Sequence, residues 1–393
     1  MKKSILLLGI LLTLGNYGQA QTIQGEIISF KTPMVYLYQV KNEYYGSTTL
    51  HDSIPVINGK FTYKYKSATP DLYYLSLQKR DRSSDLGDYL FLAPIDMKII
   101  INKDKKEKLS LQATGSEIEN KYRAFRREKD IRGNSQVCDS LTELFYAARE
   151  KEDRTEMARI KEESAPYYED ARIKTRAYVD ECIKKEEGTL FGLYLYFTNR
   201  FQNNVFNTGK EIADVRNYIS TFNDEAKTST FYTRIEEGLK RFEACSTGNA
   251  APNIAGIDMT GNPISLSLFK GKYVLVDFWS SGCGWCRKET IYLQKAYDLY
   301  KDKNFTILGV SSDYRQKDWL NAIEKDKSYW DHLLIPKDDI KKVMDQYCII
   351  GIPHIILVDP QGIIVAKELR GEEIAKTVGE FILQGTTPLS DKN

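Results

Sequence analysis

The chain has 393 residues, which is too long for one ordinary hydrophobic core and predicts two or three domains. Its 56 lysines and arginines nearly balance 54 aspartates and glutamates, which gives a net charge of +2. This balance excludes a nucleic-acid binder that relies on phosphate contacts. Hydrophobic residues make up 42% of the chain and charged residues 28%, a composition typical of soluble globular proteins.

The first 20 residues predict a cleavable signal peptide. Lys2 and Lys3 provide a positive start, an apolar run covers residues 5–14, and small residues precede Gln21. A membrane anchor is the alternative, but a spanning helix needs roughly 20 apolar residues and this run is much shorter. The first cysteine is Cys138, so the cleavage site lacks the cysteine that lipidation requires. We therefore expect an exported, periplasmic protein.

Residues 21–115 predict an antiparallel β domain. The stretches 34–38 and 72–77 are rich in aliphatic and aromatic residues, as strands are. Asn58-Gly59 lies between two short apolar stretches and is the dipeptide most typical of a hairpin turn. After it, aromatic and polar residues alternate through 61–65, as in a half-buried strand. A small antiparallel sheet or sandwich is the expected architecture.

Residues 116–245 predict a helical region. Apolar residues recur at helical spacing in 141–148. The stretch 151–187 is highly charged, and Pro166 predicts a break in its helix. We interpret the charged faces as solvated surface. A partner-binding role is the alternative, but charge patterning alone rarely specifies a partner.

Residues 246–386 predict an α/β domain, and residues 387–393 a tail. The small polar stretch 246–252 has the composition of a linker. Beyond it, helical patterns alternate with apolar strand segments at 273–279, 305–310 and 355–358. This order predicts a mixed sheet flanked by helices.

The motif Cys283-x-x-Cys286 follows the apolar strand segment 273–279 and opens a helical pattern. A helix N-terminus presents unpaired N–H groups and a positive dipole end, which stabilise a thiolate. The thiolate is the nucleophile of disulfide exchange. Two intervening residues leave the second thiol close enough to displace a substrate held on the first. The motif therefore indicates thiol redox chemistry.

The C-terminal region resembles the thioredoxin superfamily, and specifically TlpA/ResA-like exported thiol-disulfide oxidoreductases, over about residues 251–384. The segments that carry the likeness are Ala251-Pro252, Leu266 to Lys272, Val276 to Trp279, Cys286 to Glu289, Gly351 to Pro353 and Asp359 to Gly362. The β region is similar to the domain of unassigned function that often precedes such domains. The resemblance implies a thioredoxin-like α/β fold behind an antiparallel β domain and a helical region.

The resemblance also implies roles for individual residues. Cys283 would be the exposed nucleophile and Cys286 the less accessible resolving thiol. Pro353 would be cis, although only about 5–6% of X–Pro bonds are, and would place the backbone at Ile352 against the substrate. Asp277 aligns with a buried acid that exchanges a proton with Cys286, and burial would raise its pKa. The alternative is an aspartate that reaches solvent at a strand end.

The sequence departs from the family pattern at Gly282, Trp285 and His354, where tryptophan, proline and threonine are common. Residues beside the cysteines tune the thiol pKa and the reduction potential, so the redox direction of a relative does not transfer. His354 is either a packed surface histidine or, when protonated, a stabiliser of the Cys283 thiolate. Glu289 is a candidate tuning residue, and we interpret Trp279 as packing beneath the loop.

The sequence does not pair its remaining cysteines, which are Cys138, Cys182, Cys245 and Cys348. We interpret Cys138 and Cys182 as buried helix residues. Cys348 precedes Pro353 by five positions and is either a buried, apolar-like residue or a third redox thiol near the site. A zinc site through Cys283 and Cys286 would need two more ligands, and the chain has only 3 histidines. We expect neither a metal nor an organic cofactor.

Together these observations predict an exported oxidoreductase that reduces disulfides of envelope client proteins by dithiol exchange. In the resembled family, a membrane thiol-disulfide carrier restores the dithiol. One alternative is a peroxiredoxin-like peroxidase, but that chemistry uses a threonine- and proline-rich loop, which Cys283 lacks. Another is a client-binding envelope protein with a subordinate redox domain. The client, the redox direction and the oligomeric state are not predicted.

Overall fold

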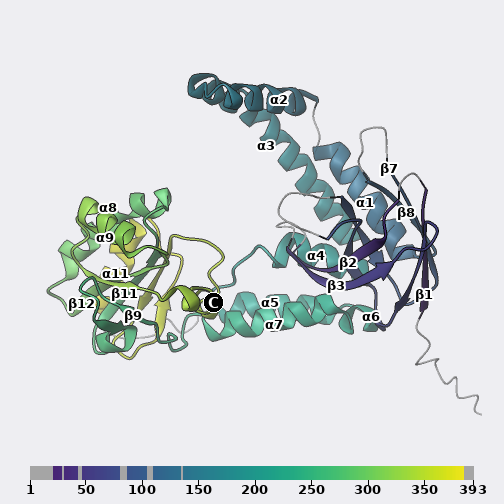
Figure 1. Cartoon of the computed structure of the whole chain (residues 1–393). Coiled ribbons are helices and arrows are strands. Elements are labelled where there is room, and N and C mark those ends of the chain that lie inside the picture. The colour runs from purple at the N-terminus through teal and green to yellow at the C-terminus, as the bar shows by residue number, and fades with distance from the viewer. Residues whose placement is uncertain are drawn as a thin grey trace, which may run out of the picture. The chain divides into compact units, whose positions relative to one another are not determined.

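The computed structural model describes residues 21–28, 31–42, 47–79, 86–103, 109–133 and 136–384. The predicted signal peptide at 1–20 and the predicted tail at 387–393 lie outside these residues. The chain divides into two compact units (Figure 1). The first unit contains the chain up to Thr198 together with Asn223–Thr230, and the second contains Asn199–Phe222 and the chain from Phe231. The predicted helical region is thus divided between the units.

Two four-stranded sheets form the β part of the first unit, in the orders β4-β1-β7-β8 and β3-β2-β5-β6. The strands are β1 (Gln21–Ile27), β2 (Met34–Asn42), β3 (Ser47–Pro55), β4 (Lys60–Tyr65), β5 (Asp71–Ser76), β6 (Gly87–Leu92), β7 (Met97–Lys103) and β8 (Leu109–Thr114). Both sheets contribute to one core, with residues such as Ile23, Leu37, Leu75 and Ile99. The pairing is antiparallel, as predicted, except that β1 and β7 run parallel.

The Asn58-Gly59 turn leads from one sheet into the other. Asn58 and Gly59 have φ angles of 52° and 74°, which the predicted tight turn requires. A single bridge pairs Ile57 with Lys60, after which β4 pairs with β1 while β3 stays with β2. The sequence therefore predicts the turn correctly but not the partner of the next strand. Local sequence specifies a turn, whereas the buried face of the strand decides which sheet it joins.

The helices of the first unit are α1 (Glu117–Gly133), α2 (Gln136–Glu150), α3 (Arg154–Lys185), α4 (Leu190–Tyr196) and α6 (Asp224–Lys227). Helix α3 packs against both α2 and α1. It begins at its N-cap Asp153, whose side chain accepts the backbone N–H of Glu156 at 3.0 Å. Pro166 lies inside α3, so the predicted break is wrong. A proline removes only one backbone donor, and the helix continues past Pro166 to Lys185.

A buried carboxylate fixes α1 to β6. Glu119 is fully buried, and its Oε2 atom accepts the backbone N–H of Phe91 at 2.6 Å. Its Oε1 atom accepts from Arg123 at 2.6 Å, and Arg123 also pairs with Asp88 at 2.5 Å. Burial raises the pKa of Glu119, while the positive charge of Arg123 opposes that rise. This network joins the helical and β parts of the first unit.

The second unit is built on a seven-stranded mixed sheet in the order β10-β9-β13-β12-β11-β14-β15. Its strands are β9 (Ala255–Ile257), β10 (Pro263–Ser265), β11 (Tyr273–Trp279), β12 (Phe305–Ser311), β13 (Asp331–Leu334), β14 (His354–Val358) and β15 (Ile364–Ala366). Strand β11 is parallel to β12 and antiparallel to β14. Every residue of β11 and β12 is buried, which explains why both strands read as continuous apolar runs.

Helices cover both faces of this sheet, which gives the predicted thioredoxin-like arrangement. On one face, α8 (Gly284–Tyr300) and α11 (Glu373–Gln384) pack against Leu275 and Ile307. On the other face, α10 (Ile340–Gln346) and the 3-10 turn η2 (Leu266–Phe269) pack against Val276 and Leu308. The side chains of successive residues in one strand therefore point to opposite faces of the sheet.

The second unit also contains α9 (Gln316–Asp326), the 3-10 turn η3 (Lys337–Asp339), α5 (Gly209–Ser220) and most of α7 (Thr230–Ala244). A π-helical turn, η1 (Phe197–Phe201), follows α4 at the boundary of the units. Helix α5 begins with a capping box between Thr208 and Glu211. Among the helices that the structure describes, none combines the length and the apolar character needed to cross a membrane.

Candidate active site

The cysteine motif lies where β11 gives way to α8. Cys283 is the N-cap of α8, and the strand before the loop is buried along its whole length. A disulfide joins Cys283 and Cys286, whose Cα atoms are 5.3 Å apart. The two cysteines thus lie at the start of a helix that follows a central strand, as the sequence predicts.

Distant side chains hold the loop before Cys283. The backbone N–H and the hydroxyl of Ser281 donate to the carboxylate of Asp313 at 2.8 and 2.6 Å. Arg287 donates to the carbonyl oxygen of Ser281 at 3.4 Å and pairs with the carboxylate of Asp326. Asp313 follows β12 and Asp326 ends α9. The loop is therefore fixed by two other segments of the unit.

The two sulfur atoms differ in access and in environment. Cys283 is half-buried, whereas Cys286 is only 3% exposed. The backbone N–H of Cys286 donates to the Sγ atom of Cys283 at 3.1 Å. This donor and the positive end of the α8 dipole stabilise negative charge on Cys283 once the disulfide is reduced. Cys283 is thus the more accessible of the two sulfur atoms and the one that accepts a backbone N–H at the helix N-terminus.

The peptide bond between Ile352 and Pro353 is cis, as the resemblance implied. The carbonyl oxygen of Ile352 lies 3.7 Å from the Sγ atom of Cys283. A disulfide sulfur carries no proton, so this is a van der Waals contact that becomes available for hydrogen bonding when Cys283 is a thiol. The side chain of Ile352 packs with Trp279 and Cys286. The cis-proline segment therefore lies directly beside the disulfide.

Asp277 is buried in β11, with 5% of its surface exposed. Its Oδ1 atom has no hydrogen-bond partner among the described residues. Desolvation raises the pKa of Asp277 to about 7, with Arg370 opposing the rise and Glu289 adding to it. The alternative that Asp277 reaches solvent is wrong, because neighbouring strands flank β11 on both sides.

His354 begins β14 and is 3% exposed, so its interpretation as a surface histidine is wrong. It follows the cis-proline on a strand paired with β11, which places its side chain in the interior. Its Nδ1 atom lies 2.8 Å from a carboxylate oxygen of Glu368, and its ring centroid lies 5.9 Å from that of Phe278. Direct stabilisation of the Cys283 thiolate by His354 stays a prediction.

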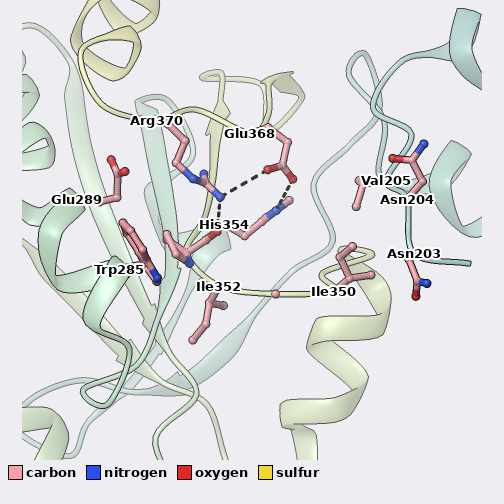
Figure 2. Close-up of a pocket in the computed structure, with 12 residues that line it drawn as sticks. Asn203, Asn204, Val205, Trp285, Glu289, Ile350, Ile352, His354, Glu368 and Arg370 are labelled. Carbon is pink, nitrogen blue, oxygen red and sulfur yellow. Dashed lines mark hydrogen bonds and ion pairs between the residues drawn. The ribbon is translucent and has the colours of Figure 1, made fainter. Parts of the chain in front are cut away.

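Arg370 connects the His354–Glu368 pair to the cis-proline segment (Figure 2). Its guanidinium donates to the carbonyl oxygen of Pro353 and lies 3.5 Å from the carboxylate of Glu368. Glu368 in turn contacts His354, and this contact lowers the pKa of the Glu368 carboxyl despite partial burial. A chain of charged groups therefore runs from the backbone beside the disulfide to the start of β14.

The other candidate residues lie on and beneath α8. Trp285 is 72% exposed, and the Nζ atom of Lys288 lies 4.4 Å from its ring centroid. Glu289 accepts the backbone N–H of Gly371 at 2.9 Å, which ties α8 to the segment before α11. Trp279 is buried with Cys286, in agreement with its interpretation as a packing residue.

A cavity of about 570 Å³ opens beside the cis-proline segment (Figure 2). Its walls include Trp285 and Ile350, and the charged groups Glu289, Glu368 and Arg370. The opposite wall is formed by Asn203, Asn204 and Val205, which precede α5 in the same unit. Aromatic, aliphatic and charged surfaces thus surround one space next to the disulfide.

Sequence reasoning did not find the residues that support the site, namely Ser281, Arg287, Asp313, Asp326, Glu368 and Arg370. Ser281 and Arg287 flank the motif, but the sequence does not show that they contact Asp313 and Asp326. Asp313, Asp326, Glu368 and Arg370 have no fixed spacing from the cysteines, and tertiary contacts alone bring them there. A weak signal exists for Glu368 and Arg370, which are opposite charges that follow the edge strand β15. No local pattern marks Asp313 or Asp326.

The comparisons agree with this geometry. Residues 247–367 match the AhpC/TSA family, and residues 21–122 match a domain of unknown function, DUF4369. The thiol-disulfide oxidoreductase ResA of Bacillus cereus is 28% identical over 151 residues, which are 38% of this chain and 85% of that protein. ResA of Bacillus subtilis is 32% identical over 136 residues, which are 35% of this chain and 73% of that protein. The chain belongs to the ResA family of thiol-disulfide oxidoreductases.

The ResA likeness covers the unit that holds Cys283 and Cys286. The thioredoxin domain of a thiol-disulfide oxidoreductase from Bacteroides vulgatus is 63% identical, and the match covers 35% of this chain and 98% of that domain, with a TM-score of 0.35. As a ResA-family member, the chain is a thiol-disulfide oxidoreductase, and its substrates contain disulfides.

Proposed function

We propose that this ResA-family protein reduces disulfides of client proteins in the cell envelope. The observation that carries the proposal is the environment of one sulfur atom. The Sγ atom of Cys283 accepts the Cys286 N–H at 3.1 Å and lies 3.7 Å from the carbonyl oxygen of Ile352. A nucleophile there is activated by a helix N-terminus and adjoins a backbone edge that an extended client can pair with.

The proposed reaction has two exchange steps. In the reduced protein, the Cys283 thiolate attacks one sulfur of the client disulfide, and the other client sulfur leaves as a thiolate. Cys286 then gives up its proton, and its thiolate attacks the sulfur of Cys283. The second client sulfur leaves, so the client gains two electrons and the Cys283–Cys286 disulfide forms.

Asp277 is the proposed proton acceptor for Cys286. A general base works best when its pKa lies near the operating pH, and burial raises the pKa of Asp277 to about 7. An ordinary exposed aspartate would be too weak a base. Glu289 and Arg370 act on Asp277 with opposite charge, which makes both of them proposed tuning residues.

The cavity beside Pro353 is the proposed seat for client residues next to the disulfide. Pro353 fixes the backbone at Ile352, and Arg370 holds the Pro353 carbonyl oxygen. Trp285 offers an exposed aromatic surface at the cavity wall. Such a site binds mainly through backbone and shape, which suits several clients.

Export and regeneration complete the proposal. The predicted signal peptide at residues 1–20 supports export, with cleavage before Gln21. A membrane thiol-disulfide carrier would then return two electrons to Cys283–Cys286. Cell fractionation and N-terminal sequencing test this part: mature protein outside the cytoplasm that begins at Gln21 supports it, and full-length cytoplasmic protein overturns it.

Insulin reduction tests the proposed activity. The full chain with dithiothreitol should reduce insulin disulfides faster than dithiothreitol alone, and Cys283→Ser should abolish the gain. Cys182→Ser is the matched control, because this half-buried thiol belongs to α3 in the other unit. Activity that survives Cys283→Ser overturns the proposal. Peroxide consumption without insulin reduction would favour the peroxidase, and stable client capture by Cys283→Ala in both redox states would favour the binding protein.

A further inference from the structure

The short segment between β15 and α11 lies against the start of β14. It follows Ala366, where β15 ends, and precedes Glu373, where α11 begins. In its middle, Leu369 is 7% exposed and belongs to the core of the second unit. The backbone N–H of Leu369 donates to the carbonyl oxygen of Ile355 at 3.2 Å. The segment is therefore fastened to β14, the strand that follows Pro353.

Glu368, in this segment, has a backbone conformation that is unusual for glutamate. Its φ is 56°, in the left-handed region that glycine adopts at no steric cost and other residues rarely occupy. Gly371 has a φ of 54° in the same segment, so the chain places glycine at one left-handed position and glutamate at the other. A residue held in such a conformation suggests a role for its side chain. The contacts of the Glu368 carboxylate show what that role is.

The Glu368 carboxylate joins two side chains, as Figure 2 shows. One oxygen lies 2.8 Å from the Nδ1 atom of buried His354, and the other lies 3.5 Å from the guanidinium of Arg370. A carboxylate only accepts hydrogen bonds, so the Nδ1 atom carries the proton that it donates. This hydrogen bond lowers the pKa of the Glu368 carboxyl and keeps it ionised. One carboxylate thus orients both an imidazole ring and a guanidinium.

Both of these side chains act on Pro353. His354 follows it directly and begins β14, and Arg370 donates to the Pro353 carbonyl oxygen. Proline has no backbone N–H, so its carbonyl oxygen is the only backbone group that can hold it by a hydrogen bond. The neighbouring carbonyl oxygen of Ile352 lies 3.7 Å from the Sγ atom of Cys283. Glu368 is therefore connected, through two partners, to the backbone beside the reactive sulfur.

We propose that Glu368 is a positioning residue for polypeptide clients, which acts through His354 and Arg370 to hold the backbone at Ile352 and Pro353. This inference rests on the proposed function, in which an extended client segment pairs with that backbone. Only a substrate with a main chain can make such a pairing. A small disulfide needs little more than access to the sulfur of Cys283. Loss of Glu368 should therefore weaken client binding more than it slows disulfide exchange.

Kinetics of insulin reduction by full-chain variants test the proposal. Asparagine tolerates the left-handed conformation, but its side chain is uncharged and one methylene shorter, so Glu368→Asn loses the contacts without adding backbone strain. We expect its KM for insulin to rise about 5-fold while kcat falls less than about 2-fold. Glu368→Gln keeps the length and can still accept from His354, so its KM should rise about 2-fold.

Glu152→Asn is the matched control. Glu152 is an exposed glutamate of the first unit with a φ of 53°, so the same substitution is made in the same backbone conformation. Its KM and kcat should equal those of the unchanged protein. Thermal unfolding shows which variants are folded, and Glu368→Gln supplies the result if Glu368→Asn is not. An unchanged KM for insulin in the folded Glu368 variants overturns the proposal.

A small disulfide separates positioning from general damage. The reduced proteins are mixed with bis(2-hydroxyethyl) disulfide, and the rate constant of exchange is measured. In Glu368→Asn, kcat/KM for insulin should fall at least about 3-fold more than this rate constant does. Equal losses for the two substrates overturn the proposal. Insulin reduction that Cys283→Ser abolishes supports the proposed function in either case, so the two can fail separately.

A double variant tests whether Glu368 acts through Arg370. Each single variant, Glu368→Asn and Arg370→Met, should raise the KM for insulin. If one side chain works through the other, the double variant should raise KM by less than the product of the two single effects. Effects that multiply would show that Glu368 and Arg370 act independently, which overturns this route.

Discussion

Arg370 donates a hydrogen bond from its guanidinium to the carbonyl oxygen of Pro353, the cis residue beside the disulfide. The same guanidinium lowers the pKa of Asp277, against the rise that burial causes. One side chain thus holds the backbone next to Cys283 and adjusts the buried acid of β11. The position of the cis-proline segment and the pKa of Asp277 therefore depend on the same side chain.

Removing charges around Asp277 should move its titration in opposite directions. Arg370→Met removes a positive charge and should raise the pKa of Asp277, whereas Glu289→Gln removes a negative charge and should lower it, each by about one pH unit. NMR titration of the Asp277 carboxyl carbon measures both shifts. Arg370→Lys keeps the charge and should leave the titration close to that of the unchanged protein. Shifts of the same sign in Arg370→Met and Glu289→Gln would contradict this account.

Asp277→Asn should change the pH dependence of stability. The pKa of Asp277 is about 7 in the folded chain against 3.8 ordinarily, so the folded protein holds a proton that the unfolded chain has released. The stabilising contribution of the protonated Asp277 carboxyl is fully present below about pH 4. It is lost as the pH rises through about 7. The loss is on the order of 4 kcal/mol.

Asparagine is neutral throughout this range, so Asp277→Asn should gain stability relative to the unchanged protein between pH 5 and pH 8. Urea unfolding at the two pH values measures this gain, and the effect of replacing oxygen by nitrogen cancels in the comparison. The exchange step at Cys286 should slow in the same variant. An equal free-energy difference at both pH values would show that Asp277 does not titrate in this range.

The ion pair between Arg287 and Asp326 should contribute more to the free energy of unfolding than a surface ion pair does. Its side chains are 25% and 18% exposed, so Arg287→Met leaves a poorly solvated carboxylate and should cost about 1–3 kcal/mol of unfolding free energy. The pair between Arg315 and Asp318 is 81% and 37% exposed, and Arg315→Met should cost less than about 0.5 kcal/mol. Chemical denaturation of the two variants gives the comparison. Equal losses would mean that the pair at the active-site loop contributes no more than surface charge.

Gly309→Ala should disturb the packing beneath the active-site loop. A Cβ atom at Gly309 of β12 would lie 2.4 Å from the Nδ1 atom of His332 and 3.3 Å from the Nε1 atom of Trp279. The expected loss of stability is about 1–3 kcal/mol. Gly209→Ala at the start of α5 is the matched control, since a Cβ atom there meets nothing within 4 Å. Thermal unfolding of both variants tests the difference, and an unchanged Gly309→Ala protein would contradict the close packing.

The parts of the site that sequence predicts are those encoded by neighbouring residues. An apolar run followed by Cys283-x-x-Cys286 specifies a buried strand, a loop and a helix N-terminus, and the resemblance of Gly351 to Pro353 to the family segment predicts the cis-proline. Burial of Asp277 is implied by the same resemblance, since the sequence alone leaves open an aspartate that reaches solvent. The strand, the loop and the helix start need only local periodicity and a motif.

The rest depends on contacts between distant segments. Nothing near His354 in sequence indicates that Glu368 will hold its ring, or that Arg370 will reach the Pro353 carbonyl. The partner of β4 is equally non-local, because the Asn58-Gly59 turn leads into a different sheet. Charge pairs between distant segments carry no spacing rule that a single sequence reveals.

Trapping the mixed disulfide tests the central claim most directly. Reduced Cys286→Ala protein is mixed with insulin, and the products are separated without reductant and mapped by mass spectrometry. The account predicts a covalent complex linked through Cys283, which dithiothreitol cleaves by reducing the mixed disulfide. It predicts no comparable complex with Cys283→Ala. A complex formed equally well through Cys286 in Cys283→Ala, or no complex through Cys283, would contradict the assignment of Cys283 as the nucleophile.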